Sequence, residues 1–111
     1  MRVAEAAMVV AEATYRVTRE FPADERFGLV SRMRRAAVSI GSNIAEGCGR
    51  STDAQFVAFL QIAMGSASEL EFQTRIASRL DFSSEDRRHD LATKITNTKR
   101  MLGKLILARR A

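Results

Sequence analysis

The sequence has very few of the residues that crosslink or interrupt small domains. Its 111 residues include one cysteine, one proline, one histidine and no tryptophan. A single cysteine excludes an internal disulfide and fits a reducing cytoplasm. One cysteine and one histidine are also too few for a closed zinc site, which takes four such ligands. We therefore expect a cytoplasmic protein without a metal or cofactor, in which Cys48 is a small buried core residue.

Long apolar runs are missing as well. No stretch of about 18 apolar residues exists, so we expect no segment that spans a membrane. Glu5 and Glu12 interrupt the apolar N-terminal segment, which argues against a secretory signal. The composition is 46% hydrophobic and 28% charged, which is enough apolar material for one core. The length and composition predict a single domain over residues 1–111.

Strand-like alternation is absent, and helical periodicity takes its place throughout the chain. Turn signals occur at 21–24, 46–53 and 80–86, and Pro22 ends the first segment. Short loops between long helices favour antiparallel neighbours, so the sequence predicts an all-α fold, an antiparallel up-down-up-down four-helix bundle. Outside the third segment, the expected core positions are Val3, Ala7, Val10, Thr14, Val17, Phe21, Leu29, Val30, Met33, Ala36, Ala37, Ile40, Ile44, Leu91, Ile95, Thr98, Leu102, Leu105 and Ile106.

Polar residues and glycines at the turns predict where the helices begin and end. We expect Asp24 to cap the second helix and Ser83 or Ser84 to open the fourth. Gly47 and Gly49 are expected to end the second helix. The candidate caps of the third helix are Ser51, Thr52 and Asp53.

The third segment, which ends at about residue 80, has more apolar surface than one bundle core requires. Its two apolar faces lie roughly 120–180° apart at 100° per residue. A helix that is apolar on two sides is buried on two sides. We therefore predict that another subunit covers the second face. The first face holds Phe56, Leu60, Ala63, Ala67 and Leu70, and the second holds Ala58, Ile62, Phe72, Ile76 and Leu80.

An ordered polar row occupies the side of the second segment opposite its apolar stripe. Arg35 and Glu69 are expected to form an ion pair between the second and third segments. Gly47 and Gly65 are expected to permit close backbone approach. Three interpretations remain open: a protein interface, a solvated face, or a ligand or nucleic-acid site. The row consists of Arg35, Ser39, Ser42 and Glu46 with Asn43 at its flank. We expect it to meet a polar strip of the third segment, Gln55, Ser66, Glu69 and Gln73, so that Ser39, Asn43 and Ser66 can satisfy one another.

The run RRAAVSIGSNIAEGCGR at 34–50 resembles the signature of the four helix bundle protein family, also called the 23S ribosomal RNA intervening-sequence protein family. Phe21-Pro22, Phe27-Gly28-Leu29 and Ala63-Met64-Gly65-Ser66 resemble it in the same order. Accessory variability proteins of diversity-generating retroelements are related to this family. The resemblance implies a left-handed bundle in a homopentameric ring, and it carries over no catalytic residue. The sequence departs from the family pattern at Arg32, Gly41 and Met64.

Positive charge is concentrated at the end of the chain. Residues 87–111 hold eight bases and one acid, whereas residues 1–86 hold ten bases and twelve acids. Such a field attracts nucleic acid, and no aromatic residues interleave with these bases, so we expect contacts with phosphates rather than base stacking. The candidate nucleic-acid-binding residues are Arg32, Arg34, Lys94, Lys99, Arg100, Lys104, Arg109 and Arg110.

The sequence contains no set of residues typical of catalysis. It has no nucleophile with a base, no phosphate-binding glycine loop and no carboxylate cluster, and His89 is expected to be an exposed surface residue. Two functions of a non-enzyme remain. One is a homo-oligomer that binds RNA or DNA through phosphate contacts. The other is a protein-interaction scaffold or an accessory subunit for a nucleic-acid enzyme such as a reverse transcriptase, without direct nucleic-acid binding.

Overall fold

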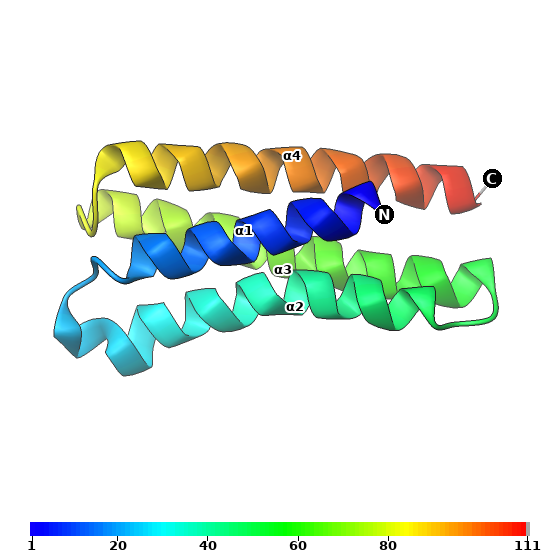
Figure 1. Cartoon of the computed structure of the whole chain (residues 1–111), viewed down its shortest axis with the longest axis horizontal. Coiled ribbons are helices and arrows are strands. Elements are labelled where there is room, and N and C mark those ends of the chain that lie inside the picture. The colour runs from blue at the N-terminus through cyan, green and yellow to red at the C-terminus, as the bar shows by residue number, and fades with distance from the viewer. Residues whose placement is uncertain (111) are drawn as a thin grey trace.

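The computed structural model describes residues 1–110, which form four long helices and no strand. The helices are α1 (Arg2–Thr18), α2 (Ser31–Cys48), α3 (Asp53–Arg79) and α4 (Glu85–Arg110). They lie side by side with alternating directions, and the two ends of the chain lie at the same end of the bundle (Figure 1). The predicted all-α, up-down-up-down bundle is therefore confirmed. None of these helices combines the length and the apolar composition that a bilayer crossing requires.

The core is built from the predicted apolar stripes. All of the expected core positions are buried except Leu29 and Leu105, which are partly buried. Threonines occupy core positions because their hydroxyls bond to the preceding turn of the same helix. Thr14 Oγ1 donates to the Val10 carbonyl at 2.8 Å, and Thr98 Oγ1 donates to the Lys94 carbonyl at 2.9 Å. These two threonine hydroxyls are thus satisfied inside an aliphatic core.

The connection from α1 to α2 is itself helical. A 3-10 turn, η1 (Ala23–Glu25), leads into a π-helical turn, η2 (Arg26–Val30), in which Gly28 has non-helical backbone angles. The Leu29 N–H donates to Glu25 Oε1 at 3.2 Å, so Glu25, rather than the expected Asp24, caps this start. The wide turn also leaves the Phe27 side chain 89% exposed. Turns of this kind are rare and frequently mark functional sites.

The caps of α3 and α4 fall within the predicted sets. Thr52 Oγ1 accepts from the Gln55 N–H at 3.2 Å, and Ser84 Oγ accepts from the Arg87 N–H at 3.3 Å. In the turn between α3 and α4, the buried Arg88 guanidinium donates to the carbonyls of Phe82 and Ser83. The sequence indicated only that Arg88 was one more base in a charged segment.

Three expectations about residues of α2 and α3 require correction. Gly47 lies inside the helix, where a Cβ would come within 2.9 Å of Phe59 Cβ, so it permits a close approach and does not end the helix. Gly65 has open space where a Cβ would lie, so no close approach occurs there. Cys48 is exposed because it lies in the last turn of α2, at the end of the bundle.

Candidate functional site

A cluster of three polar side chains joins α2 to α3. Ser39 Oγ and Ser66 Oγ lie 2.8 Å apart. Asn43 Nδ2 donates to Ser39 Oγ at 3.0 Å and to the Ser39 carbonyl at 2.8 Å. These hydrogen bonds confirm the prediction that the three residues satisfy one another, and all three side chains are part-buried. A polar contact of this kind fixes the register of two helices more than it adds net stability.

The remainder of the polar row does not pair as expected. No ion pair joins Arg35 to Glu69 among residues 1–110, although both line a small hollow of about 170 Å³ between α2 and α3. Glu69 instead accepts from Gln73 Nε2 at 3.2 Å. Glu46 pairs with Arg50 at 2.9 Å, one turn further along the chain. The expected Arg35–Glu69 contact is therefore wrong for a single protomer, because the Glu69 carboxylate bonds to Gln73 on its own helix.

The second apolar face of α3 is open to solvent in the single chain. Ile62 is 52% exposed, Phe72 is 63% exposed and Leu80 is 56% exposed. Several large apolar side chains exposed on one side of a helix favour an interaction surface. We refer to Ala58, Ile62, Phe72, Ile76 and Leu80 as the assembly face.

Three of the eight predicted phosphate-binding residues form ion pairs, and Arg34 has a neutral hydrogen-bond partner. Lys94 pairs with Asp90. Lys99 Nζ lies 3.1 Å from Glu71 Oε1, and Arg109 lies 3.3 Å from Asp53 Oδ1. Arg34 Nε donates to Thr18 Oγ1 at 2.9 Å. Lys94, Lys99 and Arg109 are thus partly neutralised by carboxylates, which weakens their attraction for an external phosphate.

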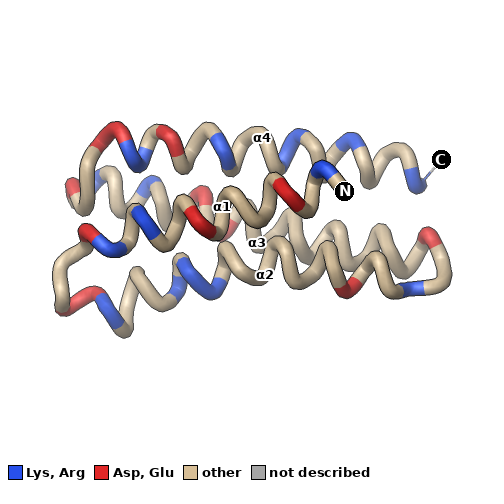
Figure 2. Tube along the Cα trace, in the orientation of Figure 1, with Lys and Arg blue, Asp and Glu red and all other residues tan. Residues whose placement is uncertain are grey.

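The other four predicted bases, like Arg34, are not neutralised by a carboxylate of the described chain. Arg32, Arg100, Lys104 and Arg110 form no ion pair within residues 1–110. Arg100 NH1 donates only to Asn97 Oδ1, at 3.2 Å. Along α4, Figure 2 shows basic positions following one another toward the C-terminal end. The structure does not bring Arg32 into this group, because Arg32 lines the small hollow between α2 and α3.

Arg2 joins this basic region although it lies at the other end of the sequence. Arg2 and Lys104 line the same hollow of about 410 Å³ between the start of α1 and α4, together with Val3 and Met101. The topology was the available signal, because an up-down-up-down bundle brings both chain ends to one end. We refer to Arg2, Arg100, Lys104 and Arg110 as the terminal basic surface.

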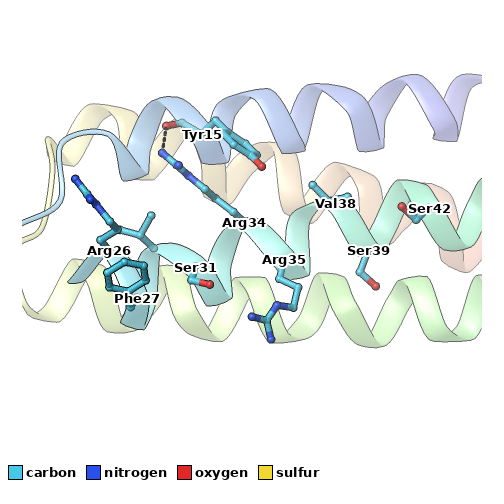
Figure 3. Close-up of a pocket in the computed structure, with 10 residues that line it drawn as sticks. Tyr15, Arg26, Phe27, Ser31, Arg34, Arg35, Val38, Ser39 and Ser42 are labelled. Carbon is cyan, nitrogen blue, oxygen red and sulfur yellow. Dashed lines mark hydrogen bonds between the residues drawn. The ribbon is translucent and has the colours of Figure 1, made fainter. Parts of the chain in front are cut away.

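A second basic region lies on the outer side of α2, toward α1. A shallow hollow of about 720 Å³ there is lined by three arginines, two aromatic residues and several hydroxyls, and no carboxylate lines it (Figure 3). The Arg34 guanidinium lies 4.5 Å from the centre of the Tyr15 ring. Sequence reasoning missed this group, since Phe27 faces outward only because of the π-helical turn. We refer to Tyr15, Arg26, Phe27, Arg34, Arg35 and Ser42 as the arginine strip.

Comparison with known proteins places this bundle in a family. A family model described as 23S rRNA-intervening sequence protein matches residues 1–104. The chain belongs to the 23S rRNA-intervening sequence protein family. A crystal structure of a protein with unknown function from the S23 ribosomal protein family of Bacteroides thetaiotaomicron has a similar fold, with a TM-score of 0.85 and 21% sequence identity over 94% of each chain. Among curated proteins, none matches this chain significantly.

In this member of the 23S rRNA-intervening sequence protein family, the described residues show little that could bind a metal. No group of three or more His, Cys, Asp or Glu side chains comes together within residues 1–110. His89 is exposed on α4, as predicted. The surface features that remain for function are therefore the assembly face, the terminal basic surface and the arginine strip.

Proposed function

We propose that this protein is a non-catalytic homo-oligomer that binds nucleic acid through the phosphate backbone. The observation that carries this proposal is the terminal basic surface. Residues 91–110 contain six bases and no acid, and half of those six have no carboxylate partner elsewhere in the described chain. Charges of one sign on neighbouring helices repel each other in the free protein. An anionic polymer relieves that repulsion and releases its own counterions when it binds.

Assembly makes this charge effective. The bases of a single terminal basic surface can neutralise only a few phosphates, and each one contributes about 0.9 to the slope of log K against log salt for duplex. Copies that cover one another's assembly faces would bring several such surfaces into one particle. A ring of five, as the family resemblance suggests, would multiply the number of phosphate contacts without any new contact within a protomer.

The experiment is a salt series with a fluorescent duplex. The binding constant of the wild-type oligomer should fall linearly with salt on logarithmic axes. Arg100→Glu with Lys104→Glu should reduce the slope by about 2 or more, since each lost phosphate contact removes about 0.9. Arg16→Glu with Arg19→Glu makes the same change in net charge at exposed positions in the last turn of α1 and at its C-cap, and should leave the slope closer to that of the wild type. Equal effects of the two pairs, or no binding at low salt, would contradict the proposal.

A second candidate function rests on the assembly face. Exposed Ile62 and Phe72 are also suited to a different protein partner, as expected of a scaffold or an accessory subunit for a nucleic-acid enzyme. This candidate requires that the chain bind no nucleic acid by itself at low salt. The salt series above therefore separates the two functions.

A further inference from the structure

We infer that the arginine strip is a second nucleic-acid site, which takes unpaired nucleotides by stacking a base on Phe27 and holding phosphates on its arginines. The inference rests on the proposed function in one respect, because it assumes that nucleic acid is the ligand of this protein. It goes further by assigning a place on the molecule and a class of nucleic acid.

The charge of the strip is unbalanced. Arg26, Arg34 and Arg35 line one hollow, no carboxylate lines it, and none of the three forms an ion pair within residues 1–110. The nearest acid along the chain, Glu25, is engaged in capping the Leu29 N–H. Three guanidinium groups around one hollow favour an anionic ligand, and planar guanidinium groups match the geometry of phosphate.

Arg34 is held in place before any ligand arrives. Its Nε donates to Thr18 Oγ1 at 2.9 Å, and its guanidinium stacks at 4.5 Å over the Tyr15 ring. The dashed contact in Figure 3 marks a further hydrogen bond, from Arg34 NH2 to the Tyr15 carbonyl at 3.5 Å. These partners are neutral, so they orient the side chain without cancelling its charge. A pre-oriented cation loses less conformational entropy when it binds a phosphate.

Phe27 gives the strip an aromatic surface. Its ring is 89% exposed at the π-helical turn, and the Arg26 guanidinium carbon lies 6.0 Å from the ring centroid. An aromatic ring beside cations is the arrangement with which single-strand-binding proteins hold bases and backbone together. Bases inside a duplex are already stacked and cannot reach such a ring. The strip is therefore selective for unpaired segments, whereas the terminal basic surface accepts any backbone.

The shape of the strip also fits an extended strand better than a compact anion. Its lining residues run from Arg26 in the η2 turn to Ser42 in α2, and the α-helical part from Ser31 to Ser42 alone has a length of about 16 Å at 1.5 Å per residue. Ser31 contributes a hydroxyl between Arg26 and Arg34, and Ser42 contributes another beyond Arg35. Hydroxyls of this kind donate to phosphate and sugar oxygens in nucleic-acid complexes.

The test compares two strands of equal length and charge, an oligothymidine and a fully abasic strand, by fluorescence anisotropy. Phe27→Leu keeps an apolar side chain but removes the ring, and it should weaken oligothymidine binding by about 5- to 150-fold, the range for loss of one stacked base. Phe27→Tyr keeps the ring and should bind like the wild type. Neither variant should change binding of the abasic strand. Equal affinities of Phe27→Leu and wild type for oligothymidine would overturn the inference.

Two controls separate this inference from other outcomes. Arg100→Glu with Lys104→Glu should weaken the binding of both strands. If the protein binds duplex but its affinity for oligothymidine is unchanged in Phe27→Leu, the proposed function stands and only this second site is overturned. Absence of binding to any strand or duplex would overturn both. Light scattering on Phe27→Leu should give the wild-type mass. A reduced mass would instead assign the strip to contacts between copies of the chain and overturn the inference.

Discussion

Ser39 and Ser66 meet between α2 and α3 with their Oγ atoms 2.8 Å apart. We predict a coupling energy of about 0.5–1.5 kcal/mol in a double-mutant cycle of Ser39→Ala and Ser66→Ala, because each single change leaves the other hydroxyl without this partner. The measurement is the free energy of unfolding from denaturant titration. Ser42 lies on the same side of α2 but forms no hydrogen bond with Ser66, so the effects of Ser42→Ala and Ser66→Ala on the free energy of unfolding should add. Additive effects in the first cycle would show that the contact contributes nothing.

Two glycines of α2 should respond in opposite directions to the same substitution. An alanine Cβ at Gly47 would lie 2.9 Å from Phe59 Cβ and 3.0 Å from Phe56 Cδ1, so Gly47→Ala should lower the free energy of unfolding by about 1–3 kcal/mol. At Gly41 the Cβ would meet only Ala7 Cβ, at 3.6 Å. Gly41→Ala should therefore raise stability, by up to about 1 kcal/mol, through its better helix propensity. The measurement is thermal and denaturant unfolding of both variants. An unchanged free energy of unfolding for Gly47→Ala would show that α2 and α3 do not approach each other this closely.

Neighbouring arginines at the start of α4 should differ strongly in their importance. Arg88 is 6% exposed and bonds the carbonyls of Phe82 and Ser83, so Arg88→Met should lower the free energy of unfolding by about 2–4 kcal/mol. Arg87 forms an exposed ion pair with Glu20 at 3.1 Å. Arg87→Met should cost less than about 1 kcal/mol. Similar losses for both variants would mean that Arg88 does not hold the turn.

Helical periodicity was sufficient to predict most of the fold. The spacing of apolar residues determines which side of each helix is buried, so the stripes and the exposed second face of α3 could be read from the sequence. The contact of Ser39 with Ser66 was predictable for the same reason. Each lies on the side of its helix that faces the other.

Features that depend on the register between helices, or on an irregular turn, could not be predicted in this way. Lys99 meets Glu71, and Arg109 meets Asp53, only because of how α3 and α4 are aligned. Spacing within α4 contains no information about that alignment. Phe27 is displayed by a π-helical turn that depends on the Glu25 cap and on the backbone of Gly28. If residues 26–30 are assumed to form an ordinary α-helix, nothing in the sequence indicates that Phe27 and Arg26 belong to a binding surface.

The assembly face should be sensitive to charge. Phe72→Glu places a carboxylate at an exposed apolar position of α3, where burial against another copy would desolvate it. We expect a lower native mass with unchanged helicity by circular dichroism. Met8→Glu is a matched control, because Met8 is 60% exposed on α1, outside the assembly face. Loss of mass in both variants, or in neither, would show that the assembly face is not the interface.

The most direct test of the account is the native mass of the wild-type protein by light scattering at micromolar concentration. We propose that copies of the chain cover the far side of α3 and thereby combine their basic surfaces. We therefore expect a particle several times heavier than the 12.3 kDa of one chain, and about five times heavier for the ring that the family resemblance suggests. A stable species of 12.3 kDa across that concentration range would contradict it.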